Sequence, residues 1–338
     1  MPSFRTGRVL RLTSQRPGLQ RVVVSIDGRE HPAFALVDVI GPVEAGDEVV
    51  VNTTAVELGL GTGGDHIIHW NLSRRAVDHA GPDHVMKLRY TSLQLDAGTS
   101  ELAHPECDRP IAGAPVVACT LHSQVPLVVL GALAVRPELR IAYVMTDGGA
   151  LPLALSDLVA DMSERDLLCG TVTAGHAFGG ELEAVNVASA LGLAVHVLRA
   201  DVVVVGMGPG VVGTGTELGT TAIEAASTLD LADAAGGTPV LCVRASSGDD
   251  RERHVGVSHH TRTIARVSRC TPLVADTSAE VRAIAGVEAV PVPTVPDIVA
   301  LLAEHDLVVR TMGRGPVDDP LAFAAAGAAG ALAALRVP

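Results

Sequence analysis

Six segments of the sequence combine glycine or histidine with side chains that bind anions or transfer protons. The longest of them, residues 206–220, reads GMGPGVVGTGTELGT and follows the apolar run at residues 201–205. Glycine lets the backbone turn with positive φ and approach a ligand closely, and the free N–H groups before a helix attract anions. We therefore expect an anion-binding loop whose ligand-binding residues are Gly206, Gly208, Gly210, Gly213, Thr214, Gly215 and Thr216.

The function of this loop has three alternative interpretations. Residues 208–213 match GxGxxG, but a dinucleotide fold places that motif after its first strand and an acidic residue after the next one. Here the next apolar run ends at Arg244, which could accept a 2′-phosphate, so a phosphorylated nicotinamide is a less favoured alternative. The lysine of a P-loop is missing. A tight strand-to-helix connection without any ligand is the structural alternative.

Acid–base chemistry is the second expectation. Asp147 precedes two glycines, His176 follows a glycine, and His259 and His260 belong to the densest histidine cluster of the sequence. Carboxylate and imidazole groups transfer protons near neutral pH and bind divalent metals. We name all four as candidate catalytic residues, and Asp147, His176 and His259 as candidate ligands of a divalent metal. Their structural alternatives are a helix cap for Asp147 and buried, hydrogen-bonded positions for the histidines.

Other residues are candidates for binding the same ligand. Lys87 is the single lysine beside 24 arginines. Codon preference explains this bias, but a compact ammonium could also be required at that position. Because only Lys87 could form a Schiff base, a pyridoxal-phosphate enzyme is disfavoured. The remaining ligand-binding candidates follow two other apolar runs and are His122, Ser123, Gly148 and Gly149.

The elements that must position these residues are strands alternating with helices. The apolar runs lie at residues 116–119, 141–145, 171–174, 201–205, 240–243, 272–275 and 307–311. This alternation predicts an α/β fold, a Rossmann-like three-layer domain with a mainly parallel sheet. Ligands of such sheets bind beyond the carboxyl ends of the strands. We therefore expect a single pocket lined by the segments that follow the strands, residues 120–126, 146–150, 175–181, 206–220 and 244–260.

The N-terminal part has a different pattern. Residues 1–70 contain short runs rich in Val and Ile between turn signals, which predicts a small β-barrel domain, with a hairpin turn at Asp27-Gly28. Polar residues 71–85 are expected to be a linker, and residues 86–338 the Rossmann-like domain. The alanine-rich run at 321–335 predicts a buried or subunit-packing helix, which is compatible with a homo-oligomer.

Composition excludes several classes of protein. The net charge of −13 disfavours nucleic acid and anionic membrane surfaces as partners. Five scattered cysteines without a CxxC pair indicate a reducing compartment and no disulfide framework. The N-terminus lacks the apolar region of a signal peptide, so we expect a cytoplasmic protein without a membrane segment.

Several strings of the sequence resemble one known family. They are VNTTAVELGLGTGG, MKLRYTSLQ, AYVMTDGGALP, GHAFGGELEAVNV, GMGPGVVGTGT and RERHVGVSHHT. Over most of residues 5–270 the chain is similar to the domain of unknown function 3866 family of uncharacterised bacterial proteins, whereas the part after residue 270 matches poorly. The resemblance implies no activity.

The residues themselves therefore carry the functional hypothesis. We expect an enzyme, a hydrolase or group transferase, that acts on a small anionic metabolite, phosphorylated or nucleotide-like. The alternative is a protein that senses a small ligand or acts as a scaffold through the same pocket without turnover. An RNA- or ribosome-binding barrel is a further alternative, which the acidic charge disfavours.

Overall fold

The computed structural model describes residues 1–60, 63–78 and 81–338, and the chain divides into two compact units, Met1–Gly98 and Thr99–Pro338. The boundary lies later than the expected start of the second domain at residue 86. The reason is that residues 86–96 form a small antiparallel pair within the first unit, β6 (Met86–Lys87) and β7 (Leu95–Asp96). The expected linker, residues 71–85, includes residues 79–80, which lie outside the described residues.

The first unit contains a closed five-stranded barrel, which confirms the predicted small β-barrel. Its strands are β1 (Phe4–Arg16), β2 (Leu19–Ile26), β3 (Arg29–Leu36), β4 (Glu48–Asn52) and β5 (His66–Asn71). They close in the order β1-β2-β3-β5-β4, with β3 and β5 parallel and the other neighbours antiparallel. Short helices α1 (Val37–Ile40) and α2 (Thr54–Glu57) follow β3 and β4.

The predicted hairpin turn joins β2 to β3. Ile26 pairs with Arg29, and the two turn residues, Asp27 and Gly28, have φ angles of 49° and 76°. Positive φ at both central residues is the type I′ geometry that suits the twist of a hairpin. A Cβ at Gly28 would have no atom within 4 Å, so only the backbone conformation requires glycine here.

Gly28→Ala is therefore expected to destabilise the barrel by about 1–2 kcal/mol, the cost of a left-handed conformation for an ordinary L-residue. Gly28→Asn is the matched control and should cost less, because asparagine tolerates this conformation. Trp70, the single tryptophan, lies in β5 of this barrel, so its fluorescence during urea unfolding reports the change. Equal losses in the two variants would contradict the conformational explanation.

The second unit is built on an eight-stranded, all-parallel sheet. The strands are β8 (Pro115–Ala118), β9 (Ile141–Thr146), β10 (Gly170–Ala174), β11 (Leu182–Ala184), β12 (Val202–Met207), β13 (Thr238–Leu241), β16 (Leu273–Asp276) and β17 (Glu288–Pro291). Their order is β11-β10-β9-β12-β8-β13-β16-β17. The parallel sheet is thus confirmed, and β12 is inserted between β9 and β8.

In the eight-stranded sheet, one predicted strand is wrong and two strands were not predicted. Residues 307–311 are extended but pair with no strand of the sheet, and Thr311 makes only an isolated bridge to Arg314. Their apolar alternation serves packing instead, because Leu307 and Val309 are buried in the core while Val308 is exposed. The missed strands are the two sheet edges, β11 and β17, which are short.

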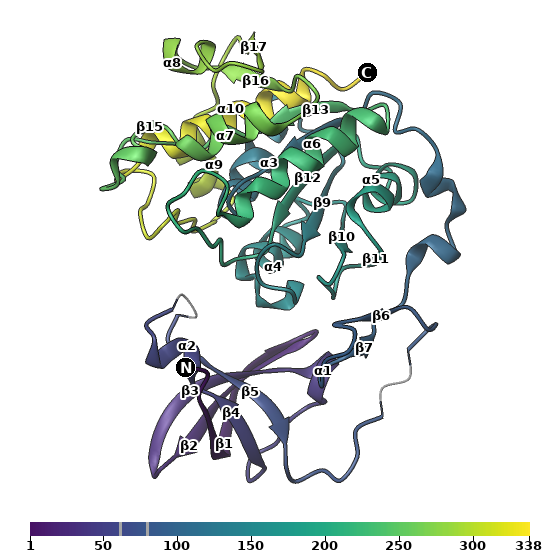
Figure 1. The fold of residues 1–338 in the computed structure, drawn as a ribbon, viewed down its shortest axis with the longest axis vertical. Coiled ribbons are helices and arrows are strands. Elements are labelled where there is room, and N and C mark those ends of the chain that lie inside the picture. The colour runs from purple at the N-terminus through teal and green to yellow at the C-terminus, as the bar shows by residue number, and fades with distance from the viewer. Residues whose placement is uncertain (61–62, 79–80) are drawn as a thin grey trace. The chain divides into compact units, whose positions relative to one another are not determined.

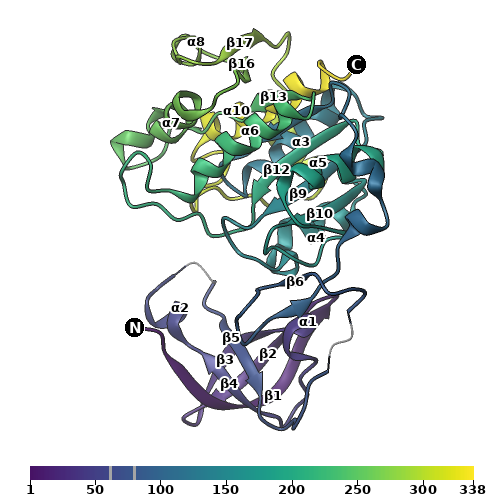
Figure 2. The ribbon, with the colours of Figure 1, turned by 45° about the vertical axis from the view of Figure 1, so that its right-hand side comes forward.

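Helices cover both faces of the sheet, which makes three layers (Figures 1 and 2). One face packs against α3 (Gln124–Val135), α4 (Asp157–Glu164), α9 (Ile298–Glu304) and α10 (Pro320–Ala334). The other packs against α5 (Val187–His196), α6 (Glu224–Ala234), α7 (His259–Val267) and α8 (Ala279–Arg282). Val117 of β8 points to the first face and its neighbours Val116 and Ala118 to the second, as the two-residue period of a strand requires.

The alanine-rich C-terminal run forms α10, which confirms the predicted buried helix. It packs against α3 of the same chain, and this approach is close because both helices present glycine. A Cβ at Gly330 would lie 1.9 Å from the carbonyl oxygen of Val128, so no larger residue fits. Within the described residues no helix is long and apolar enough to cross a membrane.

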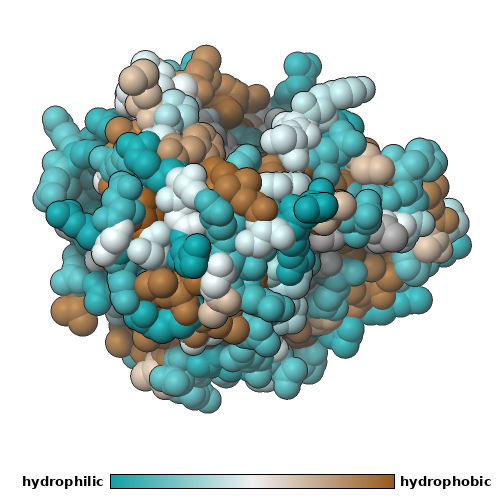
Figure 3. Space-filling model, turned by 90° about the horizontal axis from the view of Figure 1, so that it is seen from below, coloured by the Kyte–Doolittle hydropathy of each residue, from teal (hydrophilic) through white to brown (hydrophobic). Residues whose placement is uncertain are grey.

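The face of the molecule drawn in Figure 3 is mainly hydrophilic. Small apolar patches are separated there by hydrophilic residues. Scattered exposed apolar side chains of this kind are normal on protein surfaces, so we assign this face no function.

Candidate functional site

The loops that follow the central strands contact one another at the carboxyl edge of the sheet. The N–H of Ala150, after β9, donates to the carbonyl oxygen of Pro209, after β12, at 2.9 Å. The N–H of His176, after β10, donates to Asp147 Oδ2 at 2.9 Å. The structure therefore brings three of the predicted segments together.

A cavity of about 140 Å³ lies between the loops that follow β12 and β13. These loops lead to α6 and α7 on one face of the sheet, whereas β8 between them leads to α3 on the opposite face. Such a reversal is where ligands of open α/β sheets bind. We call this the arginine cavity; it is lined by Val211, Gly213, Gly215, Arg244, Arg251, Arg253, His254, His260 and Met312.

Arg244 is the central residue of the arginine cavity. Its side chain follows β13, is only 6% exposed, and donates from Nη1 to His260 Nδ1 at 3.0 Å. Within the described part of the chain it forms no salt bridge with a carboxylate. Burial and the charge of nearby Arg251 lower its pKa to about 10. A guanidinium whose hydrogen-bond partner is a neutral ring has unused N–H donors. Asp249, the nearby carboxylate that raises the pKa of Arg244, is itself paired with Arg251 and Arg314, so the charge of Arg244 is only partly compensated.

The glycine-rich loop contributes backbone donors to the same cavity. The N–H groups of Val211, Gly213 and Gly215 make no hydrogen bond within the described residues. The hydroxyls of Thr214 and Thr216 bond to each other at 2.9 Å, and that of Thr214 also bonds to the carbonyl of Gly219. The threonine side chains thus hold the loop, and the backbone is the part available to an anion.

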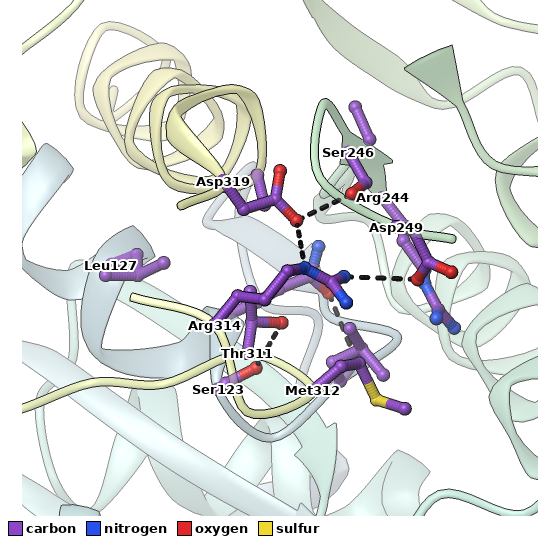
Figure 4. A pocket seen from close by; sticks show the side chains of 13 residues that line it. Ser123, Leu127, Arg244, Ser246, Asp249, Thr311, Met312, Arg314 and Asp319 are labelled. Atoms are coloured by element: carbon purple, nitrogen blue, oxygen red, sulfur yellow. Dashed lines mark hydrogen bonds and ion pairs between the residues drawn. The ribbon is translucent and has the colours of Figure 1, made fainter. Parts of the chain in front are cut away.

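A network of charged side chains lies next to Arg244, and Figure 4 shows the part of it in which Arg314 joins Asp249 to Asp319. Arg251 binds Asp249 through Nε and Nη2, each at 2.8 Å. Arg314 joins Asp249 to Asp319, with Nη2–Oδ2 and Nε–Oδ2 distances of 3.1 and 3.0 Å. The hydrogen bond from Arg251 holds the pKa of Asp249 well below its usual range. The space beside this network is only about 20 Å³, so it suits a water molecule and no ligand.

A second polar cluster lies where β9 ends and α6 begins. The carboxylate of Glu224, the first residue of α6, accepts a hydrogen bond from the Thr146 hydroxyl and one from the N–H of Gly148. Burial and, to a smaller extent, the charge of Asp147 raise the pKa of Glu224. The hydrogen bond from Thr146 opposes them, and the resulting pKa is about 7. Glu224 therefore changes its protonation state near neutral pH.

The predicted residues separate into two groups. His259 and His260 are the first two residues of α7. His260 and His254 line the arginine cavity, and the ring of His259 lies against both of theirs. Asp147 and His176 lie at the other cluster, because β9 and β13 are separated by β12 and β8. The predicted metal set of Asp147, His176 and His259 is therefore not one cluster. Among the residues that the structure describes, the three groups close enough together to hold an ion are His254, His259 and His260.

Several ligand-binding candidates have structural positions instead. His122 is buried, with Nδ1 3.1 Å from the Met207 carbonyl oxygen and Nε2 2.6 Å from Ser156 Oγ, so both ring nitrogens are used inside the unit. Burial lowers its pKa to about 4. Ser123 Oγ donates to Thr311 Oγ1 at 3.1 Å. These two residues tie the loop after β8 to its neighbours.

The glycines nearest the strands pack closely against other parts of the second unit. Gly206 lies within β12, and its carbonyl oxygen accepts from the Tyr143 hydroxyl at 2.9 Å. A Cβ at Gly149 would lie 2.4 Å from the Gly208 carbonyl oxygen, and one at Gly148 2.3 Å from Glu224 Oε2. Close packing of loop backbones therefore requires glycine at 149, whereas at 148 the atom met is the end of the Glu224 side chain. Gly210 has a φ of 108°, with open space around it.

Lys87 belongs to the first unit, where it is buried in β6, whereas the arginine cavity is formed by the second unit. Its proposed role in ligand binding stays a prediction.

Sequence reasoning did not select the charged residues that form most of the site. Asp249, Arg251 and Arg253 lie in the segment 244–260 that was expected to line the pocket, although these side chains were not singled out. The available signal was the density of arginine around the histidine cluster in DDRERHVGVSHH, in a chain of net charge −13. Residues missed in this way are Glu224, Asp249, Arg251, Arg253, Arg314 and Asp319.

The fold and the site define an α/β protein with an N-terminal barrel and a cationic cavity at the carboxyl edge of its sheet. The chain belongs to the family described as "Protein of unknown function (DUF3866)", whose model matches residues 32–330. The match therefore includes the part after residue 270, which was expected to match poorly. Comparisons with curated proteins and with solved structures gave no match.

Proposed function

We propose that the second unit is an enzyme, a hydrolase or group transferase, whose substrate is a small phosphorylated or similarly anionic metabolite. The observation that carries this proposal is Arg244, a buried guanidinium that lines a cavity and has no carboxylate partner among the described residues. Burying a charge without an opposite charge is costly, so an anion in the cavity is the natural partner. Arg253 adds a second cation beside the loop at Gly215.

Glu224 favours an enzyme over a protein that only senses the ligand. A sensor needs the arginine cavity alone, whereas an acid or base is useful only if a proton moves. A general acid or base works best when its pKa is near the working pH, and Glu224 has a pKa of about 7. In the proposed reaction, protonated Glu224 donates its proton to the leaving group and the carboxylate of Asp147 accepts one from the attacking water or hydroxyl.

The two parts of the site set the length of the substrate. Thr146 and Arg244 follow strands that are three positions apart in the sheet order β9-β12-β8-β13. At about 4.8 Å per strand, the ends of β9 and β13 lie roughly 14 Å apart. A substrate with its anionic group in the arginine cavity would therefore react at its other end, as a nucleotide-sized molecule could.

Phosphate binding to an Arg244→Met variant tests this proposal. Wild-type protein should bind inorganic phosphate or AMP, and the variant should bind them roughly ten- to a hundredfold more weakly, because a hydrogen-bonded charge is lost. Isothermal titration calorimetry measures both affinities. The ligand-free variant should melt at a higher temperature than the wild type, since an unpaired buried charge is removed.

Arg262→Met is the matched control. Arg262 is half exposed and paired with Glu280 at 2.6 Å, so its loss should leave phosphate binding unchanged. Wild-type affinity in the Arg244→Met variant would overturn the assignment of the anion site.

A further inference from the structure

The three histidines beside Arg244 look at first like a metal site. The ring centroids of His254, His259 and His260 are 4.4–5.1 Å apart, and one nitrogen of each ring lies within 4.8 Å of the others. Three imidazoles are a common ligand set for zinc. The hydrogen bonds behind the rings decide whether this set can bind a cation.

The contact between Arg244 and His260 fixes where the His260 proton lies. A guanidinium can only donate hydrogen bonds, so His260 Nδ1 accepts from Arg244 Nη1 at 3.0 Å. In a neutral ring the proton is then on Nε2. Histidines that bind metals have the opposite arrangement, in which the nitrogen away from the metal donates N–H to a carboxylate or a carbonyl. His260 therefore offers an N–H donor and no lone pair for a metal.

The charges around the cluster also favour an anion. Burial lowers the pKa values of all three histidines, and the charges of Arg244 and Arg251 lower them further; Arg253 adds to this effect at His259. For His260 and His254 the pKa values fall to about 3 and about 4, so these rings are neutral at physiological pH. Of the nearby carboxylates, Asp249 is bound by Arg251 and Arg314, and Glu217 by Arg266. The same positive potential would repel a divalent cation.

The cavity itself is suited to a phosphate group. Its donors come from the guanidinium groups of Arg244 and Arg253, the ring of His260, and the free N–H groups of Gly213 and Gly215. A tetrahedral group with three terminal oxygens can use donors from several directions at once. The volume of about 140 Å³ is several times what a single water needs, so the cavity has room for a small polyatomic anion.

We propose that the cluster of His254, His259 and His260 holds no metal and that His254 and His260 line a phosphate site, in which His260 Nε2–H donates to a phosphate monoester held by Arg244. This inference rests on the proposed function, since it specifies the anion and the groups that bind it. It replaces the expected divalent metal at His259 by an anion, and it assigns His260 to binding instead of proton transfer.

The first arm of the experiment uses wild-type protein and needs no variant to fold. After purification and dialysis, the metal content is measured by inductively coupled plasma mass spectrometry, and cobalt(II) is added as a spectroscopic probe. We expect no stoichiometric metal and no visible absorption band of bound cobalt. Stoichiometric zinc, or a cobalt band that disappears in His259→Ala, would overturn the inference.

The second arm measures inorganic phosphate binding by calorimetry. His260→Ala should weaken it about tenfold or more, because one hydrogen bond to a charged ligand is lost. His305→Ala is the control, since His305 lies beyond α9, outside the arginine cavity. Circular dichroism and the melting temperature confirm folding of each variant.

The two proposals fail in different ways. If phosphate binding depends on Arg244 but is unchanged in His260→Ala, only the role of the histidines is overturned. If wild-type protein binds neither phosphate nor AMP, the proposed function and this inference both fail.

Discussion

Replacing Asp319 by alanine is expected to lower the free energy of unfolding of the second unit by about 3 kcal/mol. The carboxylate of Asp319 is fully buried and accepts hydrogen bonds from Ser246 Oγ at 2.6 Å, Ser247 N–H at 2.8 Å and Arg314 Nε at 3.0 Å. Removing one member of a buried ion pair typically costs about 3–5 kcal/mol, because the other charge loses its partner. We expect the lower end, since Arg314 keeps Asp249 at 3.1 Å.

Urea unfolding followed by far-ultraviolet circular dichroism measures this loss, because the longer helices, α3 to α10, all belong to the second unit. Asp276→Ala is the control. Its partner Arg282 is 57% exposed, and an exposed ion pair contributes less than about 1 kcal/mol. Equal losses in the two variants would show that the network of Asp319 is no stronger than a surface pair.

The effect of Asp319 should also depend on pH. Burial alone would raise its pKa, but the hydrogen bonds from Ser246, Ser247 and Arg314 outweigh burial and lower the pKa from the ordinary 3.8. A lowered pKa in the folded state means that the stabilisation is present above pH 3.8 and is lost as the pH falls below it. The difference between wild type and Asp319→Ala should therefore be constant near pH 7 and shrink in acid.

Replacing Glu224 by glutamine is expected to stabilise the second unit at pH 8 by up to about 3 kcal/mol. The pKa of Glu224 rises from 4.5 to about 7 on folding, so the folded state holds this proton more tightly than the unfolded state. Stability contributed by that proton is complete below pH 4.5 and is lost as the pH rises to about 7, at about 1.4 kcal/mol per pH unit. Glutamine stays neutral and avoids this loss, while its amide can bond to both Thr146 and Gly148.

Urea unfolding of wild type and Glu224→Gln between pH 4.5 and 8 measures the difference, which should be near zero at pH 4.5 and largest above pH 7. Asp147→Asn adds a second check, because removing its charge should lower the pKa of Glu224 and flatten the wild-type dependence. Glu217→Gln is the control, since Glu217 is exposed and paired with Arg266. Parallel curves for wild type and Glu224→Gln would contradict a raised pKa.

The sequence by itself determined the elements of this protein. Four consecutive valines at 202–205 predicted a strand buried on both faces, and β12 has this environment because helices cover the whole sheet. Asp27-Gly28 predicted the hairpin, and the alanine-rich run predicted the buried helix α10. The edge of the sheet that carries the polar loops was also predicted, since parallel strands all end on the same side. Each of these features depends on residues close together in the chain, which is why local periodicity and turn chemistry reveal them.

The partners of the charged residues were decided by the tertiary structure. Thr146 and Glu224 are 78 residues apart, and Ser246 and Asp319 are 73 apart, so no local pattern links them. They meet because β12 is inserted between β9 and β8, and because the chain returns after residues 307–311 without adding a strand. Strand order depends on the packing of the whole core, whereas apolar periodicity only identifies strands. Burial then acts on the groups brought together, leaving Arg244 charged without a carboxylate and moving the pKa of Glu224 to about 7.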